Sequence, residues 1–206
     1  MESIGTGGCR EFKCGRTART NDFNDVALVI FTYSGEEQLI TIHHEFRRLS
    51  DFGIDELLHA YGVYVLWAGK SKARPTYIGE GDIWSRLSQH RRKFPRPIDG
   101  YVTVAGNKKR VGTKLETLIV EAVLLAIGKS KDRLPTQNRR QGNLQNLAPV
   151  IEKCCMLKIY MGGFDPFQEP GTGRPLSAKR VVSIFQNGDG DIAMEHSWRL
   201  RRIRRN

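Results

Sequence analysis

The chain has 206 residues, of which 39% are hydrophobic, so it has enough apolar residues for one core with flanking elements and is not globally disordered. Its 33 Lys and Arg residues outnumber its 22 Asp and Glu residues, and the formal net charge of +11 favours polyanionic partners such as nucleic acid or an acidic membrane surface. The longest apolar run, around Leu118–Ile127, is interrupted by Glu121 and is too short to cross a bilayer. With no secretory signal visible, we expect a cytoplasmic protein without a membrane span.

The first 58 residues contain no catalytic motif that we can identify. Residues 1–24 are rich in Gly, Thr, Arg and Asn with little periodic apolar content, and we expect them to form a poorly ordered lead. Residues 25–58 predict an N-terminal β-hairpin followed by a short helix. The expected elements are a buried strand at Val26–Phe31, a turn at Ser34-Gly35, a returning strand at Gln38–Ile42 and a helix at Asp55–Leu58.

Residues 59–150 predict the main folded unit, which begins with a strand. Successive strand residues point to opposite faces, so Tyr64 is expected on the face opposite to Val63, Val65 and Trp67, where it is available for chemistry. A basic connection at Ala68–Pro75 then returns to a second strand at Thr76–Ile78. Tyr64 and Tyr77 are therefore expected to meet on a hairpin.

Two helices and a third strand complete this predicted unit. Gly81-Asp82 supplies a turn and an N-cap for a helix in which Arg86 and His90 lie four apart, on one face. A strand at Gly100–Ala105 follows, and a second helix begins near Thr113. The predicted apolar stripe of this second helix, which would pack across the sheet, consists of Leu115, Leu118, Ile119, Ala122, Leu125 and Ala126.

Residues 151–206 predict a C-terminal extension with a basic tail. We expect a strand at Leu157–Met161, a loop rich in Gly and Pro at Gly162–Pro175, and a hairpin whose strands, Ser183–Gln186 and Ile192–Met194, flank a turn at Asn187–Gly190. The tail that follows carries five arginines and no acid, which fits contact with phosphate groups; a merely solubilising tail is the alternative. The arginines are Arg199, Arg201, Arg202, Arg204 and Arg205.

Five short segments between residues 61 and 140 follow one another in an order that is informative about the family. They are Gly62-Val63-Tyr64, Tyr77-Ile78-Gly79, Arg86 with His90 one turn later, Glu121 in an apolar helical segment, and Pro135-Thr136-Gln137-Asn138. This order resembles the core of the GIY-YIG nuclease superfamily. The resemblance implies an α/β fold with a small three-stranded mixed or antiparallel sheet flanked by helices, to which this chain adds N- and C-terminal β-containing elements.

The resemblance also implies a function. It predicts a metal-dependent DNA endonuclease that hydrolyses phosphodiester bonds with one Mg²⁺ (or Mn²⁺), on DNA that is expected to be double-stranded. Glu121 is the implied metal ligand, and Glu116, five residues earlier on the same helix, is the alternative. Tyr64 is the implied general base or water-orienting group, with Tyr77 and His90 assisting. Arg86 is implied to stabilise the phosphate and Asn138 to fix the region of Glu121 by a local hydrogen bond.

The charge pattern adds one departure and a set of expected phosphate contacts. The residue after Tyr77-Ile78-Gly79 is Glu80, where repair enzymes of the superfamily have a lysine, and Lys70 or Lys72 could replace that positive charge. Basic side chains next to the predicted site are expected to bind the nucleic-acid backbone. They are Lys70, Lys72, Arg91, Arg92, Lys93, Lys108, Lys109, Arg110, Arg139 and Arg140.

Two other functions remain open at this stage. One is a nucleic-acid-binding protein on a GIY-YIG scaffold that no longer cuts. The other is a zinc-supported RNA-binding module using Cys9, Cys14, Cys154 and Cys155, although the adjacent pair matches zinc-ligand spacing poorly and reduced structural thiols are favoured. His43 and His44 are expected on opposite faces of a strand, which argues against a shared metal.

Overall fold

The computed structural model describes residues 30–34, 37–69, 73–107, 113–138, 142–154 and 156–197. The predicted lead at 1–24 and the five arginines of the predicted basic tail lie outside these ranges. Within them the elements, in chain order, are β1 (Ile30–Ser34), β2 (Glu37–Arg48), the 3-10 helix η1 (Leu49–Asp51), α1 (Ile54–Leu58), β3 (Ala60–Ala68), β4 (Tyr77–Asp82), α2 (Ile83–Lys93), β5 (Ile98–Asn107), α3 (Thr113–Ser130), the 3-10 helix η2 (Leu144–Leu147), α4 (Ala148–Ile151), β6 (Met156–Gly163), β7 (Arg180–Gln186) and β8 (Ile192–His196).

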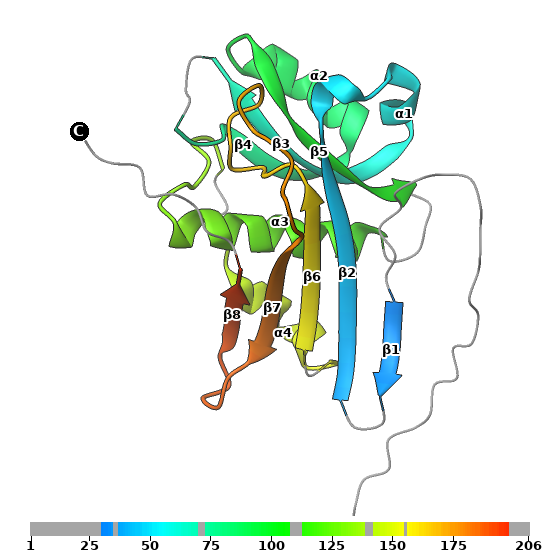
Figure 1. The fold of residues 1–206 in the computed structure, drawn as a ribbon, viewed down its shortest axis with the longest axis vertical. Coiled ribbons are helices and arrows are strands. Elements are labelled where there is room, and N and C mark those ends of the chain that lie inside the picture. The colour runs from blue at the N-terminus through cyan, green and yellow to red at the C-terminus, as the bar shows by residue number, and fades with distance from the viewer. Residues whose placement is uncertain are drawn as a thin grey trace, which may run out of the picture.

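The strands form one mixed sheet. Its hydrogen-bonded order is β4-β3-β5-β2-β6-β7-β8, and β1 pairs with β2 off this path. β2 runs parallel to β6, whereas its pairings with β1 and β5 are antiparallel. Figure 1 shows β2 reaching from the lower strands, β6 to β8, up to the group formed by β3, β4 and β5. The chain is therefore an α/β protein.

The expected three-stranded sheet is too small, and the reason lies in β2. The sequence predicts the returning strand only at Gln38–Ile42, but the strand continues to Arg48. His44 takes an inward position between Ile42 and Phe46, and all three side chains are buried. This length lets one part of β2 pair with β6 while Arg47 and Arg48 pair with β5, so the small sheet β4-β3-β5 becomes part of a larger one.

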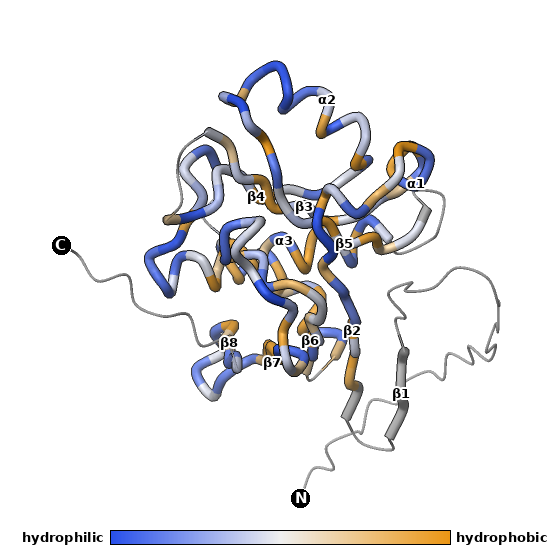
Figure 2. Tube along the Cα trace, turned by 45° about the horizontal axis from the view of Figure 1, so that its top comes forward, coloured by the Kyte–Doolittle hydropathy of each residue, from blue (hydrophilic) through white to orange (hydrophobic). Residues whose placement is uncertain are grey.

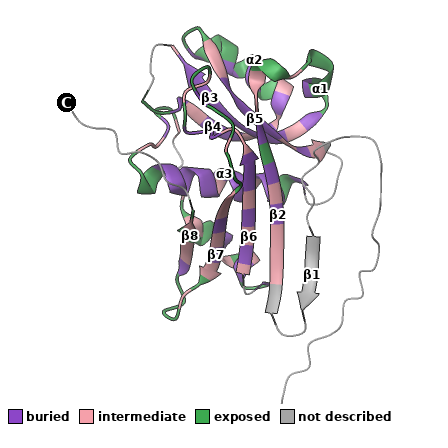
Figure 3. Cartoon of the chain, in the orientation of Figure 1, coloured by how far each residue is buried: buried purple, intermediate pink, exposed green. Residues whose placement is uncertain are grey.

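Two hydrophobic clusters cover the two faces of β3. Val63, Val65 and Trp67 face the larger cluster, which contains most of the buried hydrophobic residues of α3 and extends to the inward residues of β2, β6 and β7. Tyr64 and Leu66 face the smaller cluster, which contains residues of α1 and α2. The predicted alternation along this strand is confirmed. Figure 3 shows α3 as a largely buried helix and α2 with an exposed outer side.

The apolar stripe predicted for α3 is only partly correct. Ile119, Leu125 and Ala126 are buried as expected, whereas Leu115 is 51% exposed. The helix is buried on several sides from Ile119 onward, because it packs against the sheet on one side and against η2 on another. A single apolar stripe of residues spaced by three and four therefore underestimates the buried surface of this helix.

The remaining predicted elements agree with the structure within a few residues, from α1 to the hairpin of β7 and β8. Of the expected first hairpin, Ile30 to Ser34 form β1, while residues 26–29 and the turn residue Gly35 lie outside the described ranges. The proposed domain boundaries stay predictions, although β2, β3 and β6 contribute to one core cluster. No helix in the described part of the chain is long and apolar enough to span a membrane.

Candidate active site

A pocket with a volume of about 290 Å³ lies at the edge strand β4. Side chains from both faces of the sheet line this pocket. Tyr64 comes from the face covered by α2, and Glu121 comes from α3 on the opposite face. The lining residues are Tyr64, Tyr77, Glu80, Arg86, Lys93, Glu121, Gln137 and Asn138. Five of the six residues that the sequence predicts as catalytic or metal-binding therefore line one pocket. The sixth, His90, does not line it but contacts the hydroxyl of Tyr64.

Tyr64, Tyr77, His90 and Phe94 form an aromatic group on the side of α2. The hydroxyl of Tyr64 lies 3.1 Å from Nε2 of His90, within hydrogen-bond distance. The ring of His90 is 4.6 Å from that of Tyr77 and stacks on Phe94 at 4.9 Å, measured between ring centroids. The side chain of Tyr64 is almost wholly buried, and it nevertheless lines the pocket.

Gly79 makes room for the two tyrosines. A Cβ atom at this position would lie 2.5 Å from Cε1 of Tyr77 and 2.7 Å from the hydroxyl oxygen of Tyr64. Both distances are shorter than nonbonded carbon contacts allow, so a larger residue would displace the rings. Gly79 therefore has a local steric role: without a side chain at this position, the strand backbone can pass directly beside the rings of Tyr64 and Tyr77.

Burial keeps both partners of the Tyr64–His90 pair neutral. It raises the pKa of Tyr64 well above its usual value, with a further contribution from Tyr77 and a smaller opposing effect of Arg86. Burial also lowers the pKa of His90, and the positive charges of Lys93 and Arg86 lower it further. Near neutral pH the pair consists of a phenol and an uncharged imidazole, which is able to accept a proton.

Helix α2 supplies the positive charges. Asp82 caps its first turn by accepting a hydrogen bond from the backbone N–H of Ser85 at 3.0 Å, as the sequence predicts. Arg86, one turn before His90, is exposed and lines the pocket. Lys93 also lines it from the last turn, whereas Arg91 and Arg92 are exposed and do not. Figure 2 shows α2 mostly as a hydrophilic segment.

Asn138 holds the edge of β4. Its side-chain nitrogen donates to the carbonyl of Ile78 at 2.7 Å, and its side-chain oxygen accepts from the N–H of Ile78 at 2.8 Å. The amide thus satisfies the outward-facing backbone groups of an edge strand, next to Tyr77. These bonds differ from the expected contact near Glu121, because they act on the strand that carries Tyr77 rather than on the helix.

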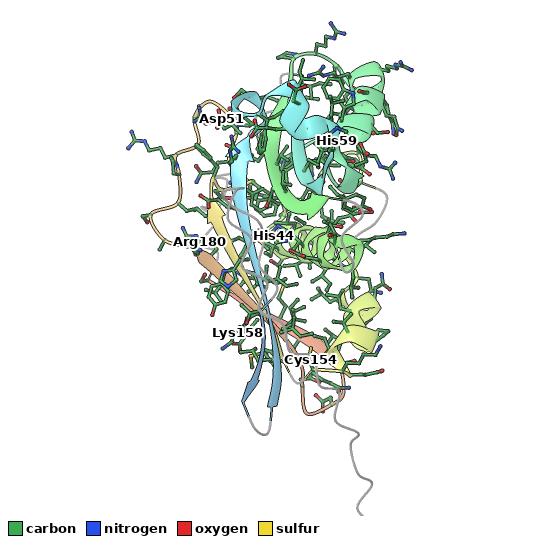
Figure 4. All side chains as sticks on the ribbon, turned by 90° about the vertical axis from the view of Figure 1, so that its right-hand side faces the viewer. His44, Asp51, His59, Cys154, Lys158 and Arg180 are labelled. Carbon is green, nitrogen blue, oxygen red and sulfur yellow. The ribbon has the colours of Figure 1, made fainter. Side chains whose placement is uncertain are left out.

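The two glutamates of α3 lie in different surroundings. Glu121 is 8% exposed and lines the pocket. Glu116 is buried on another side of the helix, where its Oε1 lies 3.3 Å from Nε2 of His44. His44 also makes a contact of 2.9 Å with the hydroxyl of Thr103 through Nδ1, and Figure 4 shows this histidine on β2 at the level of α3. The structure thus brings Glu121, and not Glu116, to the tyrosines and Arg86.

The donor groups of the pocket are compatible with Mg²⁺ or Mn²⁺. No group of three or more His, Cys, Asp or Glu side chains suited to a metal lies within the described ranges. Mg²⁺ does not need one, because it keeps several waters and is commonly bound through one or two carboxylates together with substrate phosphate. The two carboxylates of the pocket, Glu80 and Glu121, are oxygen donors of this kind.

Several predicted residues cannot be placed at the site. Of the expected phosphate contacts, those at 70, 72, 108–110, 139 and 140 lie outside the described residues. So do Cys9, Cys14 and Cys155, while Cys154 is buried in the core and its thiol donates to the carbonyl of Val150 at 3.3 Å. His43 stacks on Tyr160 on the face opposite to buried His44, so the prediction that the two histidines diverge is confirmed.

Two lining residues, Glu80 and Gln137, are not among the predicted site residues. Lys93, predicted as a contact to the nucleic-acid backbone, lines the same pocket. A period of two along β4 places Glu80 on the same face as Ile78, towards α3, and this alternation is the signal that was available. The position of Lys93 follows from its spacing of seven residues, two helical turns, from Arg86.

Comparisons with protein-family models, with curated proteins and with solved structures found no match for the chain.

Proposed function

We propose that the protein is a metal-dependent DNA endonuclease that hydrolyses phosphodiester bonds by the chemistry of the GIY-YIG nucleases. One observation carries the proposal: Tyr64, Tyr77, Arg86, Glu121 and Asn138, which lie far apart in the sequence, line a single pocket. They come from β3, β4, α2, α3 and the segment after α3. Independent structural reasons for each residue would not bring these five types together around one cavity.

The residue types match the needs of phosphodiester hydrolysis. The transition state accumulates negative charge on the phosphate oxygens, and it is stabilised by positive groups held in place beforehand. The planar guanidinium of Arg86 is charged at any working pH and suits phosphate oxygens, and Lys93 adds a second positive charge in the same pocket. A divalent cation held by Glu121 would supply further charge stabilisation and a template for the phosphate.

We infer a proton path through Tyr64 to His90. An attacking water that bonds to phosphorus loses a proton to the oxygen of Tyr64, while Tyr64 passes its own hydroxyl proton to Nε2 of His90. The raised pKa of Tyr64 makes a free phenolate unfavourable, and transfer to the neutral imidazole avoids it. The phosphorus–oxygen bond to the leaving group breaks, and the released alkoxide takes a proton from solvent. Tyr77 packs on His90 and holds its ring in place.

Plasmid cleavage tests this function. Purified protein is incubated with supercoiled plasmid in Mg²⁺, Mn²⁺ or EDTA, and the products are separated on a gel. We expect nicked or linear DNA only with a divalent cation. Glu121→Gln, which removes the charge and preserves the shape, should reduce the rate at least about 100-fold. Glu152→Gln, an exposed glutamate beyond α4, is the matched control and should cut at the natural rate.

DNA binding without cleavage would contradict the proposed function. If the natural protein binds DNA and leaves it intact with every cation and every DNA structure tried, the nuclease proposal is wrong and the nucleic-acid-binding function replaces it. Metal analysis of the same preparation addresses the zinc-supported module, which requires about one zinc ion per chain.

A further inference from the structure

Glu80 lies in the pocket at a position where the proposed function does not require a carboxylate. It follows Tyr77-Ile78-Gly79 on the edge strand β4 and pairs across the strand with Val63. Val63 and Ile78 both belong to the cluster on the side of α3, so the alternation of the strand places Glu80 on that side as well. This is the side from which Glu121 enters the same pocket.

One oxygen of Glu80 lies against two hydroxyl groups. Tyr61 donates to Oε2 at 2.9 Å. The single hydroxyl proton of Thr117 is shared between the same oxygen, at 3.3 Å, and the carbonyl of Lys114, at 3.0 Å. Thr117 is fully buried one helical turn before Glu121, so this contact fixes Glu80 beside the part of α3 that carries Glu121. Among the described residues no hydrogen bond to Oε1 is present, which leaves this oxygen available for another partner.

The charge of the pocket favours a cation as this partner. Two carboxylates in one small pocket repel each other, and a divalent cation between them removes the repulsion. The lining carboxylates, Glu80 and Glu121, formally balance the lining cations, Arg86 and Lys93. A pentacovalent phosphate that gains negative charge therefore needs further positive charge, which a cation held by both carboxylates would bring.

We propose that Glu80 is a second carboxylate of the divalent-cation site, acting through Oε1 either directly or through a cation-bound water. Tyr61 is then a positioning residue, because its hydroxyl holds the other oxygen of Glu80. This inference rests on the proposed nuclease function, which itself needs only Glu121. It adds that the protein binds a divalent cation before DNA supplies its phosphate oxygens.

Mn²⁺ binding in the absence of DNA tests the proposal. Titration calorimetry and the electron paramagnetic resonance signal of free Mn²⁺ give the affinity of the natural protein and of its variants. We expect one Mn²⁺ per chain, and Glu80→Gln should weaken its binding at least about 10-fold, as should Glu121→Gln. Tyr61→Phe should weaken it less, and the exposed control Glu152→Gln should leave it unchanged. The Mn²⁺ concentration for half-maximal plasmid cleavage should rise with Glu80→Gln, with most of the maximal rate restored at high Mn²⁺.

Two results overturn the role of Glu80 and leave the nuclease intact. The first is a natural protein that cleaves DNA and a Glu80→Gln variant with the same Mn²⁺ affinity within a factor of two and the same maximal rate. The second is a Glu80→Gln variant with unchanged Mn²⁺ affinity but a lower maximal rate, which would mean that Glu80 acts in the reaction without holding the cation. If the natural protein neither cleaves DNA nor binds Mn²⁺, the proposed function and this inference fail together. Unfolding curves of each variant establish that the compared proteins are folded.

Discussion

At the scale of single residues, the most informative contact is the one between Tyr64 and His90. From the sequence, Tyr64 is a strand residue on the face opposite to Val63, Val65 and Trp67. In the structure it is enclosed by Tyr77, His90 and the backbone at Gly79, with its hydroxyl on the imidazole. A buried phenol is a poor base by itself, and the neutral histidine behind it gives the proton a destination.

The pH dependence of cleavage follows from the lowered pKa of His90. As a proton acceptor His90 must be neutral, and its folded pKa lies below its usual 6.5 because of burial and of the nearby charges of Lys93 and Arg86. Activity should therefore persist as pH falls through 6.5 and decline only below it. Lys93→Met removes one of the charges that lower this pKa, so the acidic limb of the pH–rate profile should move to higher pH.

The control for this pH shift is Lys153→Met, which makes the same charge change at an exposed site away from the pocket and should leave the acidic limb in place. The shift is measured as kcat/KM against pH. The same pKa bears on stability: because His90 binds its proton less readily in the folded state, its contribution is present above pH 6.5 and is lost as pH falls through the folded pKa. An acidic limb that Lys93→Met leaves unmoved would exclude His90 as the acceptor.

At the scale of elements, α3 joins the pocket to the long strand β2. Glu121 lines the pocket, while Glu116, five residues earlier, contacts His44 on another side of the helix. His44 also bonds to Thr103 on β5, so this buried polar group ties three elements together. His44, Thr103 and Glu116 do not line the pocket. Because their contacts join β2, β5 and α3, we infer that they fix the position of α3 against the sheet.

Removing one partner of this group should destabilise the fold. Glu116→Ala leaves His44 buried with fewer polar contacts, and we expect a loss of about 3 kcal/mol in the free energy of unfolding, measured with urea. Replacing both residues together, as His44→Leu with Glu116→Leu, should cost less than the two single changes added. A loss below about 0.5 kcal/mol for Glu116→Ala, equal to that of the exposed control Glu152→Ala, would contradict this role.

At the scale of the whole molecule, the candidate site depends on elements outside residues 61–140. Trp67 of β3 is buried in the larger cluster, and its indole N–H donates to the carbonyl of Pro166, after β6, at 3.4 Å. The inward residues of β2 and β6 belong to the same cluster as most of the buried hydrophobic residues of α3. We therefore expect the chain to unfold as one cooperative unit.

A fragment comparison tests this expectation. Residues 59–150 alone would lack β2 and β6, whose inward residues share one core cluster with Val123 and Leu124 of α3, so part of that apolar surface would be exposed to water. The fragment should show no cooperative urea transition by tryptophan fluorescence or far-ultraviolet circular dichroism, whereas the full chain should show a single transition by both probes. A fragment that unfolds cooperatively at the same urea concentration as the full chain would contradict a shared core.

Local patterns predicted much of this structure, and long-range pairing accounts for the rest. The alternation at Tyr64, the N-cap at Asp82 and the hairpin of β7 and β8 depend on neighbours within a few residues, and each is found as expected. The pairing of β2 with β6 joins residues more than a hundred positions apart, and no local spacing encodes it. For the same reason Glu80 and Glu121 look unrelated in the sequence although they line one pocket.

The most direct test of the central claim is metal-triggered cleavage of DNA that is already bound. Protein in excess is equilibrated with an end-labelled duplex in EDTA-treated buffer, Mg²⁺ is added, and the single-turnover rate is followed for the natural protein and for Glu121→Gln. The account predicts equal binding before Mg²⁺, cleavage by the natural protein after it, and a rate at least about 100-fold lower for Glu121→Gln. Intact duplex with the natural protein, or equal cleavage by both, would contradict it.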